Sequence, residues 1–215
     1  MMAKTLKATL SRILGFPSDG ADIFRYTMYQ TLAPLMEELA ASFAAPGRLL
    51  AVSGAGQLAA PFQNRGFEIV ETHFPEADWH NLPFADSSFD VVMSDQVLEH
   101  IADPFRCASE ARRVLRPGGL QIHTTCFVNP IHDAPGDNYR FTPDGLRLVF
   151  AREQEILAGG WGNPLVPLLW LFPRIAFRPV PVSPRNPLSW LATWNRDRWP
   201  IVTWYVGRTP SVVAS

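Results

Sequence analysis

Residues 82–119 read LPFADSSFDVVMSDQVLEHIADPFRCASEARRVLRPGG, and this stretch decides the fold class. Asp103 followed by Pro104 is typical of a helix start, because aspartate caps free N–H groups and proline fits the first turn. The sequence Arg116-Pro117-Gly118-Gly119 is a strong helix stop. The predicted elements are a buried strand at 89–94, a helix at 103–115 and a strand at 120–126. This order predicts a right-handed crossover between parallel strands.

The flanking sequence extends the same alternation. Thr142 and Pro143 repeat the cap-and-proline signal. Prolines and tryptophans predominate from Trp161 to Pro200, where the periodicity is lost. Further strands are predicted at 48–53, 67–70 and 201–207, and helices at about 24–43, 58–64 and 142–152. We therefore expect an N-terminal helical segment, 1–47, and one α/β domain, 48–215, with an insertion or cap at 161–200.

Composition narrows the functional classes. The chain has 215 residues, of which 47% are hydrophobic and 18% charged, so a sizeable core is expected. The net charge of −1 provides no basic field for nucleic acid. Two isolated cysteines, Cys107 and Cys126, predict neither a disulfide framework nor a zinc site, and no metal site is predicted. The absence of a secretory signal and of a long apolar run favours a cytoplasmic protein.

Lysine is confined to Lys4 and Lys7. The rest of the chain therefore has no lysine for a Schiff base, a phosphate loop or a Tyr-x-x-x-Lys dehydrogenase site. The fingerprint G-x-G-x-x-G is also absent, which makes a nicotinamide-dependent oxidoreductase a poor interpretation.

Several short motifs of residues 82–119 stand in a characteristic order. They are Leu82-Pro83-Phe84, Asp86, Ser88-Phe89-Asp90-Val91-Val92, Val97-Leu98-Glu99-His100, Asp103-Pro104 and Arg116-Pro117-Gly118-Gly119. In these residues the chain resembles the class I S-adenosylmethionine-dependent methyltransferase family, in particular the branch that contains the ubiquinone and menaquinone methyltransferases. The resemblance implies a Rossmann-like, doubly wound, mostly parallel sheet of about seven strands with an antiparallel last strand. It also implies S-adenosylmethionine as the cofactor.

A second group of motifs lies further along the chain. It comprises His132-Asp133, Asp137-x-Tyr139-Arg140-Phe141-Thr142-Pro143, Gly145-Leu146 and Gly160-Trp161-Gly162-Asn163. These residues look like a subgroup of the family that is associated with glycan and cell-surface biosynthesis.

The resemblance also implies a set of cofactor-binding residues. Ser53, Gly54 and Gly56 would line the methionine part of the cofactor. The remaining positions would be Glu71 at the end of the second strand, Asp78 and Trp79 beside the adenine, and Asp95 and Gln96 closing the site. Carboxylates and hydrogen-bond acceptors at strand ends suit a sulfonium cofactor with an amino group and a ribose diol.

The glycine motif departs from the family pattern. Ala51 stands where the family has an acidic residue, and Ser53 replaces its first glycine. Ala55 and Gln57 occupy later glycine positions. A binding or scaffold protein with a methyltransferase fold is therefore the alternative to an active enzyme.

Candidate residues for the chemistry follow the strand at 120–126. His132 and Asp133 are candidates for a general base, which methyl transfer to a hydroxyl requires. Tyr139 and Arg140 are candidate substrate-positioning residues. The alternatives are that His132 ties the loop together and that Asp137, Tyr139 and Arg140 brace the Thr142 cap. The leading hypothesis is methyl transfer, at oxygen, to a small or glycan-like acceptor.

Two apolar segments suggest further contacts. Leucines and an isoleucine at helical spacing in 1–16 alternate with Lys4, Lys7 and Arg12, which predicts a packing helix or a basic amphipathic helix on a membrane. Residues 165–177 (LVPLLWLFPRIAF) are apolar but interrupted by two prolines. They predict a lid over the sheet, a homo-oligomer interface or a contact with a lipid-linked substrate.

Overall fold

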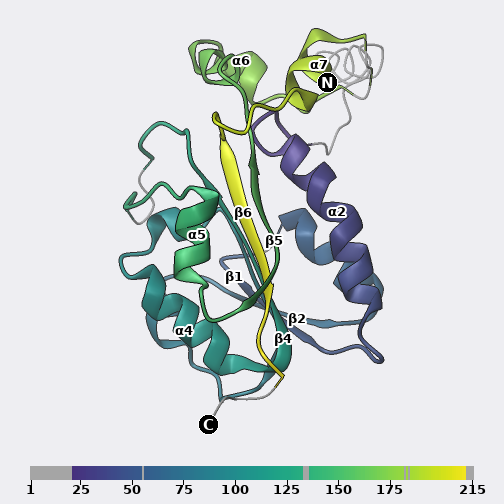
Figure 1. Ribbon diagram of the computed structural model, residues 1–215, viewed down its shortest axis with the longest axis vertical. Helices are drawn as coiled ribbons and strands as arrows, with labels where there is room; N and C mark the ends of the chain where they lie inside the picture. Colours follow the sequence, from purple (N-terminus) through teal and green to yellow (C-terminus); the bar gives the residue numbers. More distant parts are fainter. Residues whose placement is uncertain (1–20, 55, 133–135, 182, 184, 212–215) are drawn as a thin grey trace, which may run out of the picture.

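A computed structural model (Figure 1) describes residues 21–54, 56–132, 136–181, 183 and 185–211. Six strands form one sheet in the order β2-β1-β3-β4-β6-β5. Their bounds are β1 (Arg48–Val52), β2 (Glu68–Thr72), β3 (Phe89–Asp95), β4 (Leu115–Cys126), β5 (Gln154–Trp161) and β6 (Val202–Arg208). The first four strands are parallel, and β6 pairs antiparallel with both β4 and β5. The predicted Rossmann-like sheet with an antiparallel last strand is confirmed.

The described sheet has six strands rather than about seven. Residues 73–88 join β2 to β3 through a single short 3-10 turn, η2 (Trp79–Asn81), with no strand between them. Strand β5 was not predicted from the sequence. It lies at the edge of the sheet, contains adjacent glycines and is largely exposed over Gln154–Ile156, so it lacks the apolar alternation that marks a buried strand.

Helices cover both faces of the sheet (Figure 1). Helix α2 (Tyr26–Ala41), η1 (Gly56–Ala59) and α3 (Ala60–Asn64) pack on one face in the same core as Leu49 and Val91. Helices α4 (Pro104–Val114) and α5 (Pro143–Val149) pack on the other face with Leu50 and Val92. Both predicted caps are confirmed, because Asp103 accepts from Arg106 N–H and Thr142 from Gly145 N–H, each at 3.0 Å.

Part of the sequence signature serves the sheet itself. Asp90 accepts from the Arg48 backbone N–H at 2.7 Å and from the Arg116 guanidinium at 2.6 Å, so it joins the start of β1 to β4. The predicted Arg116–Gly119 stop lies inside β4, at a register shift opposite β3. A Cβ at Gly119 would lie 3.0 Å from the Asp90 carbonyl oxygen, which explains why a glycine suits this position.

The Trp/Pro-rich segment forms a cap at one end of the sheet. Its elements are η4 (Val166–Leu171), α6 (Pro173–Ala176) and α7 (Pro187–Thr193). They lie beyond the carboxyl ends of the parallel strands (Figure 1). The fully buried Asn163 holds the cap by donating to the carbonyls of Leu191 and Trp194 and by accepting from the N–H groups of Leu165 and Val166. Among the described residues, no helix has the length and apolar character needed to cross a bilayer.

Candidate active site

A turn with left-handed backbone follows β1 at the carboxyl edge of the sheet. Ser53, Gly54 and Gly56 have φ values of 57°, 84° and 52°. At the end of the neighbouring strand β3, Gln96 has a φ of 59°. Such backbone is costly for residues other than glycine, and it concentrates at functional sites. The turn and the end of β3 therefore form a constrained edge of the kind where open α/β sheets bind ligands.

Close packing joins this turn to Asp95. A Cβ at Gly56 would lie 2.8 Å from Asp95 Oδ2 and 3.2 Å from the Tyr29 hydroxyl. At Gly54, by contrast, a Cβ would meet no described atom within 4 Å. Only Gly56 is therefore needed for the close approach of the turn to Asp95.

Asp95 is held in place by hydroxyl donors. Thr124 Oγ1 donates to Asp95 Oδ1 at 2.5 Å, and the Tyr29 hydroxyl donates to Oδ2. Burial, together with the Asp95 charge, raises the pKa of Tyr29, so its hydroxyl stays protonated and keeps donating. Arg25 lies close enough to interact with both side chains. The carboxylate therefore has a fixed position and direction.

A cavity of about 410 Å³ opens beside Asp95. Its walls include Ser53, Asp78, Trp79, Asp95 and Gln96, which are five of the eight residues predicted to bind the cofactor. Trp79 is buried, and its indole Nε1–H has no hydrogen-bond partner in the described part of the chain. The Asp78 carboxylate accepts a hydrogen bond from the backbone N–H of His80 and also contacts the ring Nδ1 of His80. These two contacts lower the pKa of the Asp78 carboxyl.

Three predicted cofactor residues do not line this cavity. Gly54 and Gly56 belong to the turn behind it. Glu71 is exposed, and its carboxylate lies 3.8 Å from His73. In the pairing of β1 with β2, Ala51 lies opposite Glu71 and Val52 lies opposite Thr72, so Glu71 is one residue before the end of β2. Glu71 therefore shares a sheet face with Ala51. Val52, which lines the cavity, is on the opposite face.

A second cavity, of about 390 Å³, adjoins the first and shares Gln96 and His100 with it. Its polar walls include Arg25, Glu99 and His132. Trp170 and Phe177 of the cap line its other side. The carboxyl end of β3 therefore stands between two cavities, one of which is partly walled by the cap.

His132 lies at the second cavity, as the candidate base requires. Its ring Nδ1 lies 3.0 Å from Asn129 Nδ2 and 3.2 Å from the Pro130 carbonyl oxygen. Its backbone N–H also donates to Asp137 at 3.0 Å, so the residue helps to hold its loop as well. Asp133 lies outside the described residues.

Asp137 and Arg140 brace this loop. The Arg140 guanidinium binds both carboxylate oxygens of Asp137 and donates to the carbonyls of Tyr139, Asn129 and Pro130. The bidentate bond holds the pKa of the Asp137 carboxyl well below its ordinary value. Tyr139 donates to the Ala102 carbonyl and lines neither cavity. The geometry favours the bracing role for both Tyr139 and Arg140.

The sequence interpretation omitted several residues of the site. Arg25 immediately precedes α2 and Tyr29 lies in its first turn, and both reach the Asp95 side chain at the sheet edge. Glu99 and His100 belong to the 3-10 turn η3 (Leu98–His100) and were not among the candidate site residues. The sequence Val97-Leu98-Glu99-His100 was itself the available signal, whereas nothing local marks Arg25 or Tyr29.

Comparison with known proteins supports the resemblance to methyltransferases that the sequence motifs indicate. Residues 36–122 match the family described as methyltransferase domain. An uncharacterized methyltransferase of Mycobacterium sp. (strain KMS) is 40% identical over 95 residues, which cover 36% of this chain and 38% of that protein. The chain spans less than two fifths of the length of the curated relatives that it matches.

Solved structures share the fold at low sequence identity. An S-adenosylmethionine-dependent methyltransferase from Mesorhizobium loti has a TM-score of 0.51 at 14% identity, covering 82% of this chain and 97% of that one. The [4+2]-cyclase SpnF has a TM-score of 0.51 at 15% identity, covering 92% and 99%. The fold is therefore the Rossmann-like fold of the class I methyltransferases.

The family match and the fold agree with each other. Residues 36–122 are similar to the methyltransferase domain family, and the described chain has the Rossmann-like fold of the class I methyltransferases. S-adenosylmethionine is the cofactor that this similarity implies.

The first cavity fits that cofactor in size and charge. Its volume lies within the range typical of small-molecule sites. S-adenosylmethionine carries a sulfonium and an ammonium group against one carboxylate, so it is cationic. The described walls contribute the carboxylates of Asp78 and Asp95 and contain neither lysine nor arginine. Asp95 would face the amino-acid part, and the apolar face of Trp79 suits the adenine.

Substitution of the two turn glycines tests this geometry. Both Gly54→Ala and Gly56→Ala place a side chain at positive φ, at a similar cost of roughly 1–2 kcal/mol in stability. Only Gly56→Ala drives a methyl group against Asp95. We expect Gly56→Ala to weaken cofactor affinity about tenfold or more in calorimetric titration, and Gly54→Ala to change it by less than about threefold. Equal losses for the two variants would contradict the role assigned to the Gly56–Asp95 contact.

Proposed function

We propose that this chain transfers a methyl group from S-adenosylmethionine to a hydroxyl of a small or glycan-like acceptor. The observation that carries the proposal is the pair of adjoining cavities that share Gln96 and His100. A donor in the first cavity and an acceptor in the second would meet at the end of β3. Alignment of two reactants in this way can supply most of the acceleration of a displacement reaction.

The residues around the cavities would divide the work. Asp95, fixed by Tyr29 and Thr124, orients the methionine part of the donor. The bound cofactor supplies an activated methyl group on a sulfonium. As the new C–O bond forms and the S–C bond breaks, the hydroxyl proton must leave the acceptor.

His132 is the proposed acceptor of that proton, with Asp133 beside it in sequence. The hydrogen bonds of the His132 ring to described residues are made at Nδ1, which leaves Nε2 for the acceptor. Tyr139 and Arg140 would act on substrate placement indirectly, by holding the 129–140 loop in position.

Methyl transfer from labelled S-adenosylmethionine to a panel of methyl hexosides and 6-deoxyhexosides tests the oxygen acceptor. We expect base-stable label in at least one glycoside, and a lower kcat for His132→Gln with an unchanged KM for the cofactor. Labelling of amine or thiol acceptors alone would contradict O-methylation.

The alternative is a binding or scaffold protein that retains the fold without the activity. Two observations favour it: Ala51 occupies the acidic position of the glycine motif, and SpnF shows that proteins of this shape include one named for a different reaction. A scaffold with a lost cofactor site would not bind S-adenosylmethionine, whereas the enzyme must.

The cap also presents an apolar surface with basic character. Leu168, Leu171, Phe172, Ile175 and Phe177 are about half exposed or more. Residues 165–200 contain five arginines and a single acidic residue, Asp197. Because Trp170 and Phe177 also line the second cavity, we propose that this surface contacts an anionic membrane that carries a lipid-linked acceptor. The basic helix predicted at 1–16 lies outside the described residues.

Co-sedimentation with vesicles of phosphatidylcholine and phosphatidylglycerol tests the membrane contact. We expect pelleting at low salt that Leu171→Glu reduces severalfold. Leu148→Glu is the matched control, because Leu148 is 69% exposed on α5, outside the cap, against 74% for Leu171. Equal effects of the two substitutions, or no pelleting of the unmodified protein, would contradict a membrane contact through the cap. A concentration-dependent dimer lost only in Leu171→Glu would indicate a homo-oligomer interface instead.

A further inference from the structure

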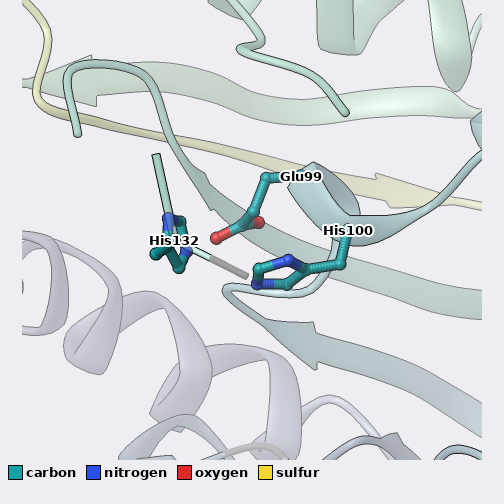
Figure 2. A group of neighbouring side chains, drawn as sticks. All are labelled: Glu99, His100 and His132. Carbon is teal, nitrogen blue, oxygen red and sulfur yellow. The ribbon is translucent and has the colours of Figure 1, made fainter. Parts of the chain in front are cut away.

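We propose that Glu99, His100 and His132 bind a divalent metal ion at the wall of the second cavity. Figure 2 shows the three side chains pointing toward one another. One ligand atom from each residue lies within 4.8 Å of those of the other two. Glu99 and His100 come from η3 after β3, and His132 comes from the loop after β4. No metal site was predicted from the sequence, because these residues are brought together only by the fold.

The Glu99 carboxylate is buried without an ion pair. Its residue is 1% exposed, and Thr125 donates to Oε2 at 2.8 Å. No salt bridge joins it to a basic side chain within the described ranges. Cys126 also forms a side-chain hydrogen bond with Glu99. The positive charge of Arg140 acts on Glu99, but both terminal nitrogens of its guanidinium are bound to Asp137. Buried carboxylates are ordinarily paired with a cation or coordinate a metal, so a divalent ion bound here would compensate the Glu99 charge.

The two histidines are oriented as metal ligands are. His100 contacts the Gly136 carbonyl through Nδ1, and His132 contacts the Pro130 carbonyl and Asn129 through its own Nδ1. Contacts of one ring nitrogen with a carbonyl commonly fix the other nitrogen of a histidine for a metal. Two imidazoles and one carboxylate suit Zn²⁺, Mn²⁺, Fe²⁺ or Co²⁺. Ligand bonds of about 2.0–2.2 Å to a tetrahedral ion place the ligand atoms about 3.4 Å apart, so the three side chains must draw together by up to about 1.4 Å.

The position of this cluster gives the ion a role that rests on the proposed function. All three residues line the second cavity, and His100 also lines the first. An acceptor hydroxyl bound to the ion would have a lowered pKa and would release its proton to water in the open cavity. The alkoxide would then form the C–O bond as the S–C bond breaks, leaving the neutral thioether. In this arrangement His132 acts on the acceptor hydroxyl through the ion, as a ligand, and water is the final acceptor of the proton.

Titration of the tag-free, chelator-treated protein with Co²⁺, followed by visible absorption, tests the site without any substrate. We expect one ion per chain with micromolar affinity, displaced by Zn²⁺. The substitutions Glu99→Gln and His132→Ala should each weaken binding about 100-fold. The matched control is His73→Ala, which removes an exposed histidine that also lies beside a carboxylate, Glu71.

The outcomes separate the site from the proposed function. Absence of Co²⁺ binding at about millimolar metal would overturn the site, as would affinity unchanged by both Glu99→Gln and His132→Ala. Because Glu99 is buried, circular dichroism must show that its variant is folded; the half-exposed His132 provides a second variant that does not depend on a buried position. Cofactor binding is measured separately in metal-free buffer. Metal binding without cofactor binding would support the metal site and contradict the methyltransferase proposal. Cofactor binding without metal binding would support the methyltransferase proposal and overturn the metal site.

Discussion

Replacing Asp95 by asparagine is expected to weaken the affinity for S-adenosylmethionine by about 10- to 100-fold. A hydrogen bond to a charged group contributes about 1.5–3 kcal/mol, and the cationic cofactor would also lose an attractive charge. Asparagine keeps the shape of the side chain and can still accept one of the hydroxyl bonds from Tyr29 and Thr124. The dissociation constant from calorimetric titration measures the loss.

The substitution Glu71→Gln is the matched control for Asp95→Asn. It removes the same charge from an acidic residue that does not line the cavity. We expect a change of less than about twofold. A large loss for Glu71→Gln with unchanged binding for Asp95→Asn would restore Glu71 as the cofactor residue and show that the site is placed at the wrong strand end.

Replacing Asn163 by alanine is expected to destabilise the fold by about 3–5 kcal/mol. The side chain is fully buried and makes four hydrogen bonds to backbone groups of the cap, at 2.9–3.2 Å. Leaving buried donors and acceptors unpaired costs about 1–3 kcal/mol each, although some of these groups can reach water after the change. Urea unfolding monitored by tryptophan fluorescence measures the free energy of unfolding.

Asn195→Ala makes the same chemical change beside the same junction. Asn195 is exposed, accepts one hydrogen bond from the Gly162 N–H at 3.0 Å and donates one to the exposed Asp197 at 3.1 Å. We expect it to cost about 1 kcal/mol. If both variants lose the same small amount, Asn163 does not anchor the cap.

Local sequence signals were sufficient to predict most of the sheet. The caps at Asp103 and Thr142 and the strands β1, β3 and β6 depend on neighbouring residues, so they are readable from short segments. Strand β5 escaped prediction because its pairing with β6 is non-local and its own residues are weak strand formers. In the sequence, the motif Gly160–Asn163 was interpreted as a mark of a subgroup of the family. In the structure, Asn163 of this motif anchors the cap through its hydrogen bonds to backbone groups.

The site was harder to predict because the fold assembles it from distant segments. Asp95, Asp78 and Trp79 follow strand ends in a recognisable pattern and do line one cavity. Tyr29 reaches Asp95 across 66 positions of sequence, and no local signal marks such a contact. Likewise, Glu99 and His132 meet only because β3 and β4 are neighbours, which brings the segments following them to the same edge.

The central claim is that the first cavity still binds the cofactor despite the altered glycine motif. Calorimetric titration of the purified protein with S-adenosylmethionine, and in parallel with S-adenosylhomocysteine, tests it most directly. We predict saturable binding of both compounds with micromolar dissociation constants and a stoichiometry near one. Absence of heat at millimolar cofactor would contradict an active methyltransferase and support the scaffold alternative.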